Sequence, residues 1–156
     1  MKLGLGTQLR HLIELLDGAV EQSYVDAGLN YRPRYTPVMR VLAEQSSATI
    51  GELASLGGLT QPAATQTVAV MVKKGLLTVS AGGEDGRQRV VRLSAAGAAM
   101  LPQLRVCWRA TKFAADSLDA ELAMPLSSCL SQAITALETR SFTERIRDAN
   151  ANKLEG

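Results

Sequence analysis

Residues 49–93 have the sequence TIGELASLGGLTQPAATQTVAVMVKKGLLTVSAGGEDGRQRVVRL, and they carry the clearest structural signals of the chain. Thr49 and Glu52 stand at the spacing of a capping box, in which each side chain accepts a hydrogen bond from a backbone N–H left unpaired at a helix start. A helix over residues 50–56 is therefore expected. Gly57 and Gly58 then supply a turn, because glycine tolerates the positive φ at which many helices end.

A second helix is predicted from Thr60 to Lys74. Thr60 is a good cap, and Pro62 is acceptable in the first turn because its missing N–H would have no partner inside the helix. One face is expected to pack against the preceding helix; it carries Ala64, Val68 and Met71. The opposite side is small and hydrogen-bonding for two turns and becomes cationic only at Lys73 and Lys74, as suits a helix inserted N-terminus first.

The second helix is followed by a predicted β-hairpin. Residues 76–80 and 89–93 favour strands, and the loop between them is charged and contains three glycines. Two helices followed by such a hairpin form a winged helix-turn-helix, which presents one helix to a DNA major groove and the hairpin to the backbone or minor groove. The predicted fold class is therefore mainly α, with a small hairpin wing, and double-stranded DNA is the predicted partner.

Helices are also predicted on both sides of this segment. Apolar residues recur at helical spacing over 5–20, over 101–122 and over 126–146. These are more apolar stripes than a small winged helix needs, so we interpret the surplus as a homodimer interface. The predicted organisation is a helical dimerisation region over 1–30 and 95–150 around a DNA-binding lobe over 31–94.

The helix boundaries carry their own signals. Residues 31–35 are expected to form an extended connector, and Thr36 with Pro37 to cap and open a helix that runs to about Gln45. Ser94 is expected to cap a long helix in which Pro102 predicts a kink. The final helix is expected to continue through residue 146, and residues 149–156 to form a frayed tail.

Composition and charge agree with a DNA-binding protein. Hydrophobic residues make up 46% and charged residues 21%, and no apolar run approaches the roughly 20 residues that span a membrane. No secretory signal is recognisable at the start, so a cytoplasmic location is expected. The segment 31–92 has eight basic residues against four acidic ones, a net charge of +4, whereas the whole chain is +2 and the remainder is therefore −2.

The sequence offers little for metal, cofactor or enzyme chemistry. Cys107 and Cys129 lack CxxC spacing, and His11 is the only histidine, so no zinc site is expected. The glycines of the hairpin do not form a phosphate-cradling loop followed by Lys and Ser or Thr. No nucleophile and base are convincingly paired. We therefore expect neither an enzyme nor a bound cofactor.

The order of elements resembles the MarR family of bacterial transcriptional regulators over nearly the whole chain. The second helix follows the family pattern through Gln61, Pro62, Ala63, Val68, Met71, Lys74, Gly75, Leu76 and Leu77. The hairpin matches the wing motif of Asp, any residue, Arg through Asp85, Gly86 and Arg87. The junction after it is also similar, with Val90 to Leu93, Ser94 and Gly97.

The resemblance implies roles for the wing residues. Arg87 would enter the minor groove, and Asp85 would hold the hairpin. An Arg in a narrow minor groove meets concentrated negative potential, and a nearby carboxylate can limit its rotamers. Gln66 stands where related members frequently have Arg; Gln suits adenine and Arg suits guanine, so a different operator preference is expected.

These arguments predict a homodimeric repressor on a pseudo-palindromic operator. The predicted DNA-contacting residues are Thr60, Gln61, Pro62, Ala63, Thr65, Gln66, Lys73, Lys74, Asp85, Arg87 and Arg89. The resemblance further implies a small-molecule effector pocket between dimerisation helices and DNA-binding lobe. Its candidate residues are His11, Tyr31, Arg34, Tyr35 and Trp108. Packing is the competing interpretation for each of these five.

Two other functions stay open at this point. A redox-sensing regulator would use Cys107 or Cys129; packed thiols are the competing interpretation, although Arg105 and Arg109 lie near Cys107 in the sequence. A winged helix can also act as a protein-interaction module without DNA. The basic helix end and the basic wing argue against this alternative.

Strand alternation places Arg89 and Arg92 on opposite faces of the hairpin, so their DNA contacts are less clearly indicated than that of Arg87.

Overall fold

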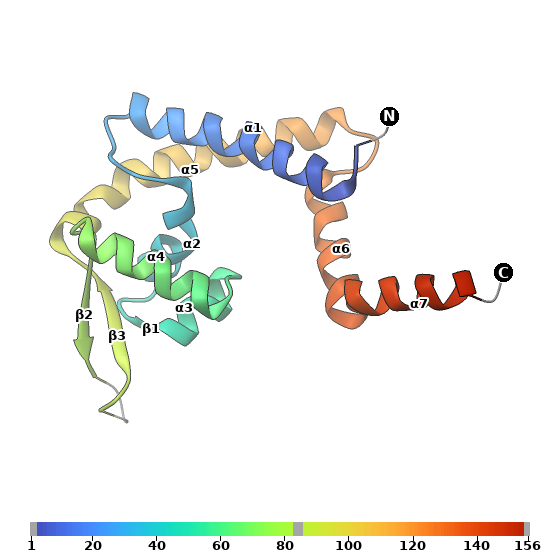
Figure 1. The fold of residues 1–156 in the computed structure, drawn as a ribbon. Helices are drawn as coiled ribbons and strands as arrows, with labels where there is room; N and C mark the ends of the chain where they lie inside the picture. The colour runs from blue at the N-terminus through green and yellow to red at the C-terminus, as the bar shows by residue number, and fades with distance from the viewer. Residues whose placement is uncertain (1–2, 83–85, 155–156) are drawn as a thin grey trace. The chain divides into compact units, whose positions relative to one another are not determined.

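The computed structural model describes residues 3–82 and 86–154, and Figure 1 shows their course. The chain divides into two compact units, Met1–Arg109 and Ala110–Gly156. The long helix α5 (Ala95–Glu121) contributes its first part to the first unit and its last part to the second. No helix of the described part of the chain is long and apolar enough to cross a membrane.

The first unit contains most of the secondary structure. Its elements before α5 are α1 (Leu5–Asp26), the short 3-10 helix η1 (Pro33–Tyr35), α2 (Thr36–Glu44), β1 (Ala48–Thr49), α3 (Ile50–Gly57), α4 (Gln61–Lys73), β2 (Leu77–Ala81) and β3 (Arg89–Leu93). The three strands form one antiparallel sheet in the order β1-β3-β2. The pair β2–β3 is the hairpin that extends from this unit in Figure 1.

The predicted winged helix-turn-helix is confirmed. Helices α3 and α4 lie against each other, and the hairpin follows α4 directly. The face of α4 predicted to pack inward is buried, and so is Leu53 of α3 opposite it. Thr67 joins that buried face. Helical periodicity therefore predicted both the two helices and their contact.

One hydrophobic core holds this unit together. Its side chains come from α1, residues 31–35, α2, the helices α3 and α4, the three strands and the first part of α5. The largest side chains exposed by less than 2% are Tyr24, Met39, Leu53, Met71, Leu104, Val38 and Val91. Because the three strands and helices α3 and α4 share this core, the orientation of the exposed face of α4 is fixed by packing.

Two expectations about the connector and α2 were wrong. Residues 33–35 form a turn of 3-10 helix instead of an extended segment. Thr36 is the first residue of α2 and makes no capping hydrogen bond. Its Oγ1 instead accepts from the hydroxyl of Tyr31 at 3.2 Å and pairs with that of Tyr24 at 3.4 Å. The Thr36 hydroxyl therefore makes tertiary contacts with two tyrosines, whereas the local sequence predicted that it would cap α2.

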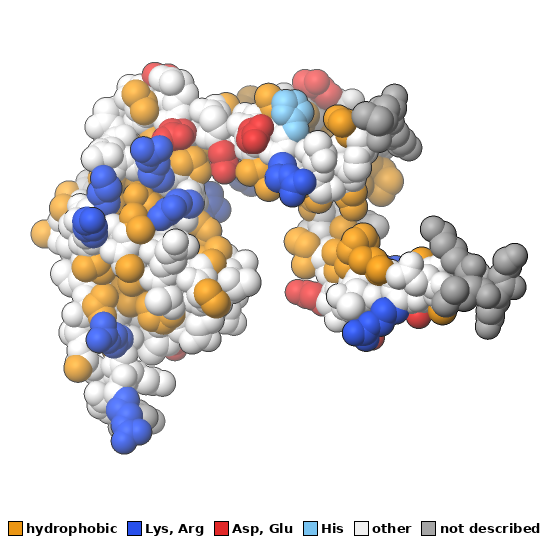
Figure 2. Space-filling view, viewed as in Figure 1, with side chains coloured by type: hydrophobic (Ala, Val, Ile, Leu, Met, Phe, Trp, Pro, Cys, Tyr) orange, Lys and Arg blue, Asp and Glu red, His pale blue; other side chains and the backbone are white. Residues whose placement is uncertain are grey.

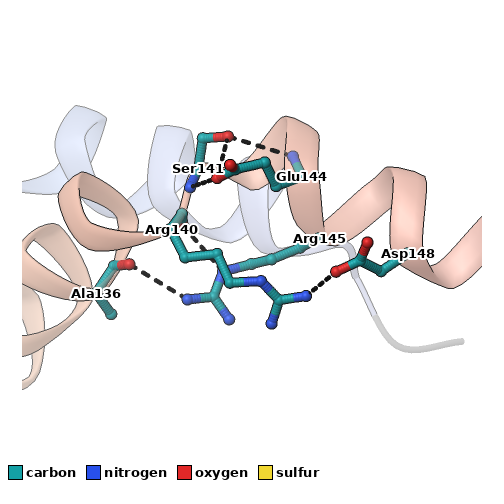
Figure 3. Close-up of polar contacts among 6 residues, drawn as sticks. All are labelled: Ala136, Arg140, Ser141, Glu144, Arg145 and Asp148. Atoms are coloured by element: carbon teal, nitrogen blue, oxygen red, sulfur yellow. Dashed lines mark hydrogen bonds and ion pairs between the residues drawn. The ribbon is translucent and has the colours of Figure 1, made fainter.

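The second unit contains the end of α5, then α6 (Leu126–Thr139) and α7 (Phe142–Leu154). The expectation of one continuous final helix was wrong, because the helix breaks at Arg140 and Ser141. Figure 3 shows the reason. The backbone N–H of Ser141 donates to Glu144 at 2.7 Å, and the N–H of Glu144 donates to Ser141 Oγ at 3.2 Å, which is a second capping box.

Arginines tie the two sides of this break together. The guanidinium of Arg145 donates to the carbonyl oxygens of Arg140 and Ala136, each at 3.2 Å. The Ala136 carbonyl also accepts from the backbone N–H of Arg140 at 3.0 Å. Arg140 forms an ion pair with Asp148 of α7 (Figure 3).

The predicted frayed tail was also wrong in part, because α7 continues to residue 154. Helix α5 runs on past Pro102 without ending there.

Candidate nucleic-acid interface

The start of α4 is fixed by two neighbouring caps. Thr60 Oγ1 accepts from the backbone N–H of Ala63 at 3.3 Å. Upstream, Thr49 and Glu52 form the predicted capping box of α3, with hydrogen bonds of 3.2 and 2.7 Å. Between the two helices, Gly58 ends α3 at φ +66°, a conformation that a side chain would strain. These local signals set where α4 begins and how it leaves α3.

The exposed side of α4 is uncharged over most of its length. Its exposed residues are Gln61, Pro62, Thr65, Gln66, Ala69, Val72 and Lys73. The first charged side chain of the helix is Lys73 in its last turn, and Lys74 follows at the cap. In Figure 2 the surface over the middle of α4 is accordingly apolar or uncharged. The sequence-predicted residues of α4 thus share one face, except Ala63, which is only partly exposed.

The hairpin carries the arginines. Strands β2 and β3 pair from Leu77 with Leu93 to Ala81 with Arg89, and beyond that pair the N–H of Gly82 donates to the carbonyl of Gln88 at 3.2 Å. The side chains of Arg87 and Arg89 are exposed near the tip. Figure 2 shows Lys and Arg side chains along the hairpin as far as its tip. Asp85, the predicted partner of the wing arginine, lies outside the described residues.

Arg92 forms a hydrogen bond across the hairpin. Its guanidinium donates to Ser80 Oγ of the neighbouring strand at 3.3 Å. Both Arg89 and Arg92 are exposed, although strand alternation directs them to opposite faces. Arg92 therefore cross-links the hairpin, in addition to the charge it contributes.

The base of the wing is held by backbone contacts. Ser94 donates its backbone N–H to Leu76 at 2.9 Å and its hydroxyl to Gly75 at 2.5 Å. Ser94 Oγ also accepts from the N–H of Gly97 at 3.0 Å, which confirms its predicted role as the cap of α5. A Cβ on Gly97 would stand 2.2 Å from the carbonyl oxygen of Leu76. Gly97 therefore permits the close approach of α5 to the strand that carries the wing.

Two of the five predicted effector residues lie in a cluster of tyrosines. The ring of Tyr31 makes edge-to-face contacts with Tyr24 and Tyr35, at centroid distances of 4.8 and 5.5 Å. Burial raises the pKa of the Tyr31 phenol, while its hydrogen bond to Thr36 acts in the opposite direction. Tyr31 is therefore neutral at physiological pH. Arg34 is exposed and lies over Tyr35 at 5.9 Å.

Trp108 and His11 have different surroundings. Trp108 is buried, as its place in the apolar stripe of α5 indicated, and the guanidinium of Arg40 lies 5.1 Å from its ring centroid. The indole N–H of Trp108 is buried with no hydrogen-bond partner among the described residues. His11 is exposed on α1, with Glu14 3.9 Å away. The structure thus groups Tyr31 with Tyr35 and Arg34, whereas His11 lies beside Glu14.

Arg40 is the residue that sequence reasoning missed. It lines a surface groove of about 470 Å³ between α2 and α3, whose lining residues are Thr36, Pro37, Arg40, Val41, Glu44, Gln45, Leu56 and Gly57. None of the five predicted effector residues lines this groove. The one signal in the sequence was a lone Arg in a helix that is otherwise apolar up to Glu44.

The cysteines and acidic residues offer no further site in the described residues. Cys107 is 8% exposed and Cys129 is half-buried, and neither forms a disulfide. Within residues 3–82 and 86–154, no group of three or more His, Cys, Asp or Glu side chains is arranged to hold a metal ion.

Comparison with known proteins gives a family for the winged-helix segment. The family model that matches describes the MarR family, and it matches residues 27–88. This range includes α2, α3, α4 and the hairpin up to Gln88. No curated protein sequence matches the chain significantly.

Solved structures with the same fold cover most of the chain. The transcriptional regulator MOSR of M. tuberculosis, solved in complex with DNA, has a TM-score of 0.70 at 22% identity, over 88% of this chain and 98% of that one. PcaV from Streptomyces coelicolor, solved with its natural ligand, has a TM-score of 0.60 at 20% identity, over 90% and 99%. NadR with 4-hydroxyphenylacetate has a TM-score of 0.57 at 18% identity, over 87% and 93%.

Proposed function

We propose that this chain, whose residues 27–88 match the model of the MarR family, is a DNA-binding transcriptional repressor that acts as a homodimer on a pseudo-palindromic operator. The observation that carries the proposal is the exposed face of α4, uncharged until Lys73 and followed by a hairpin with arginines near its tip. As a regulator of bacterial genes it would act in the cytoplasm.

Each part of this surface suits a different part of a DNA duplex. The polar first turns of α4, with Gln61 and Gln66, suit base edges in the major groove. Lys73 and Lys74 at the far end of the helix suit phosphates. Arg87 and Arg89 suit the backbone or a narrow minor groove beside it. DNA contacts by Thr60, Pro62, Ala63, Thr65 and Asp85 remain part of the proposal.

The proposed homodimer rests on the exposed apolar side chains of the second unit. No described side chain over residues 110–152 is fully buried, and large apolar ones are strongly exposed: Phe113 by 77%, Phe142 by 58% and Ile134 by 57%. Isolated helices of this length are marginal in water without a packed apolar face. We therefore assign the exposed apolar side chains of the helical region 95–150, with the apolar side of α1 within 1–30, to a dimer interface.

Dimerisation is also what the DNA surface requires. One α4 covers only one half-site, whereas a two-fold dimer places two such helices about one helical turn apart. The winged-helix lobe over 31–94 would then bind DNA, and the flanking helices would set the spacing of the two lobes.

A small-molecule effector is the finer part of the proposal. Arg40 lines the groove between α2 and α3 and lies over the buried ring of Trp108, and its guanidinium can bind a carboxylate. An effector that binds one lobe spacing better than another would shift the dimer away from its DNA-bound form. The five sequence-predicted pocket residues stay candidates.

The effector proposal is tested with 4-hydroxyphenylacetate, the molecule bound to NadR, and with benzoate as probes. Either is expected to raise the melting temperature and weaken DNA binding, and Arg40→Ala should remove both effects. Arg109→Ala is the control, because Arg109 is an exposed arginine of α5 that is neither in the groove lining nor among the five candidates. Equal responses of wild type and Arg40→Ala would contradict the role of Arg40.

DNA binding itself is tested by titrating a fluorescent duplex at increasing salt. Phosphate contacts release counterions, so affinity should fall on the order of 10³-fold between about 50 mM and about 200 mM salt. A flat salt dependence would contradict the proposal and favour a protein-interaction module. Oxidation of Cys107 is a weaker alternative, because the thiol is buried.

A further inference from the structure

The exposed face of α4 lacks the side chains that read G·C base pairs. Arg and Lys pair with guanine, and Asp and Glu accept from cytosine. The helix has none of these before Lys73, which lies in its last turn. What it exposes instead is a row of Pro62, Thr65, Ala69 and Val72, which fall at helical spacing on one side. The chemistry of this row is apolar.

Thr65 lies in the middle of that row and has already used its hydroxyl hydrogen. Its Oγ1 donates to the carbonyl oxygen of Gln61 at 2.9 Å, one turn back in the same helix. The side chain is exposed. The groups left for an outside partner are the methyl group and the acceptor lone pairs of Oγ1. The methyl suits the C5-methyl of thymine, with which Thr methyl groups make apolar contacts in the major groove.

We propose that Thr65 determines specificity by contacting a thymine C5-methyl group, within a half-site of A·T pairs beneath α4. The proposal rests on the proposed DNA-binding function and names the chemistry that this face recognises. Gln66, beside Thr65 on the exposed side, would read adenine through its amide. Arg87 favours the same base composition, because A·T tracts narrow the minor groove.

The experiment removes the methyl group from either partner. The operator is first selected from a random duplex library with the wild-type full chain. Each thymine of the half-sites is then replaced in turn by deoxyuridine, which lacks only the C5-methyl. The same duplexes are titrated with Thr65→Ser, which keeps the hydroxyl and loses the methyl, and with Thr65→Val, which does the reverse.

One thymine in each half-site should respond. Its replacement should weaken wild-type binding about fourfold per half-site, the equivalent of about 0.8 kcal/mol for one buried carbon. Thr65→Ser should weaken binding to the thymine operator by the same factor. Replacing that thymine by deoxyuridine should then cause no further loss of affinity. Thr65→Val should keep the wild-type sensitivity. This pattern is the coupling expected of two groups in contact.

Thr139→Ser is the matched control. Thr139 is an exposed helical threonine whose hydroxyl donates to the carbonyl of Thr135 at 2.9 Å, the same arrangement as at Thr65. It lies on α6, outside the winged helix. This variant should keep both the affinity and the sensitivity to deoxyuridine, so a loss confined to Thr65→Ser reports the DNA contact and not the helix.

Two different failures are distinguishable. Absence of any selected sequence would contradict the proposed function and this inference together. A selected operator whose half-sites consist of G·C pairs, or one bound equally with thymine and deoxyuridine at every position, would leave the DNA-binding function standing and overturn the role of Thr65. Loss of the response in Thr65→Val would assign specificity to the hydroxyl as an acceptor and overturn it as well.

Discussion

The two units of this chain use the same kind of apolar helical pattern with opposite results. In the first unit the apolar residues of α2, α3, α4 and the strands are buried in one core. In the second unit, α6 has no buried residue, and Leu130, Ile134 and Leu137 are exposed. An apolar stripe therefore predicts that a helix face will be buried, without specifying its partner. One unit supplies its own core, and the other is proposed to obtain it from a second copy.

The largest expected effect comes from charging the second unit. The double variant Ile134→Asp and Phe142→Asp changes two exposed side chains, so the first unit should stay folded. Buried in a dimer interface, however, unpaired carboxylates would be strongly destabilising. We expect a monomer by sedimentation and at least about a 100-fold loss of operator affinity, since one half-site remains.

The control adds one carboxylate at a polar position of α6. Gln132 is exposed on α6, and Gln132→Asp should remain dimeric. If the double variant also remained dimeric and bound the operator normally, the apolar faces of α6 and α7 would not be the interface.

The next effect is confined to the first unit. Gly97→Ala would place a Cβ 2.2 Å from the carbonyl oxygen of Leu76, and backbone atoms cannot move aside cheaply. Overpacking of this kind costs about 1–3 kcal/mol of the free energy of unfolding, measured by urea denaturation. Gly51→Ala is the control, because its Cβ would meet nothing closer than Thr49 Oγ1 at 4.0 Å. Equal stabilities of the two variants would show that the wing base is not tightly packed.

A third change removes a charge from the wing. Arg87→Ala should weaken operator binding by about 10-fold, within the range of about 1–3 kcal/mol for an arginine that contacts DNA. Arg147→Ala, on α7, should leave affinity unchanged. Both are measured by fluorescence anisotropy at one salt concentration. An Arg87→Ala variant with wild-type affinity would remove the wing from the DNA-binding surface.

The smallest effects are expected from variants of the two capping boxes, one of which lies in each unit. Thr49→Ala should cost about 1 kcal/mol of unfolding free energy in the first unit. Ser141→Ala should reduce helicity at the start of α7, visible by circular dichroism, with little effect on the first unit. A loss of core stability in Ser141→Ala equal to that in Thr49→Ala would contradict the separation of the two units.

The second capping box should also depend on pH. The N–H and hydroxyl of Ser141 donate to Glu144 and hold the pKa of its carboxyl below the ordinary value of 4.5. Its contribution is therefore complete above pH 4.5 and is lost as the pH falls through the lowered pKa. Ser127 likewise lowers the pKa of Asp119 before α6. Glu144→Gln removes the titrating carboxyl. If the helicity of this variant fell with decreasing pH as much as that of the wild type, other groups would be responsible for the loss at acid pH.

Sequence predicted the winged helix well because its signals are local. Thr49, Glu52, Thr60 and the glycines of the turn act within a few residues, and periodicity alone separated the buried and exposed faces of α4. Ser141 and Glu144 have the same spacing as Thr49 and Glu52, yet the break they cause was missed. The apolar spacing of Leu137, Phe142 and Ile146 continued across it and outweighed the cap.

What sequence did not predict depends on contacts between distant segments. Thr36 turns to the tyrosine hydroxyls of α1 and the connector instead of capping α2. Arg40 meets Trp108 across 68 positions of the chain, and nothing local to either residue indicates that contact. The DNA-contacting set and the effector residues stay predictions, because each awaits a bound partner.

Selection from a random duplex library tests the central claim most directly. A dimer that presents two copies of α4 predicts a pseudo-palindromic consensus whose half-site centres lie about 10 base pairs apart. Enrichment of a single unsymmetrical site, or of no sequence at all, would contradict it.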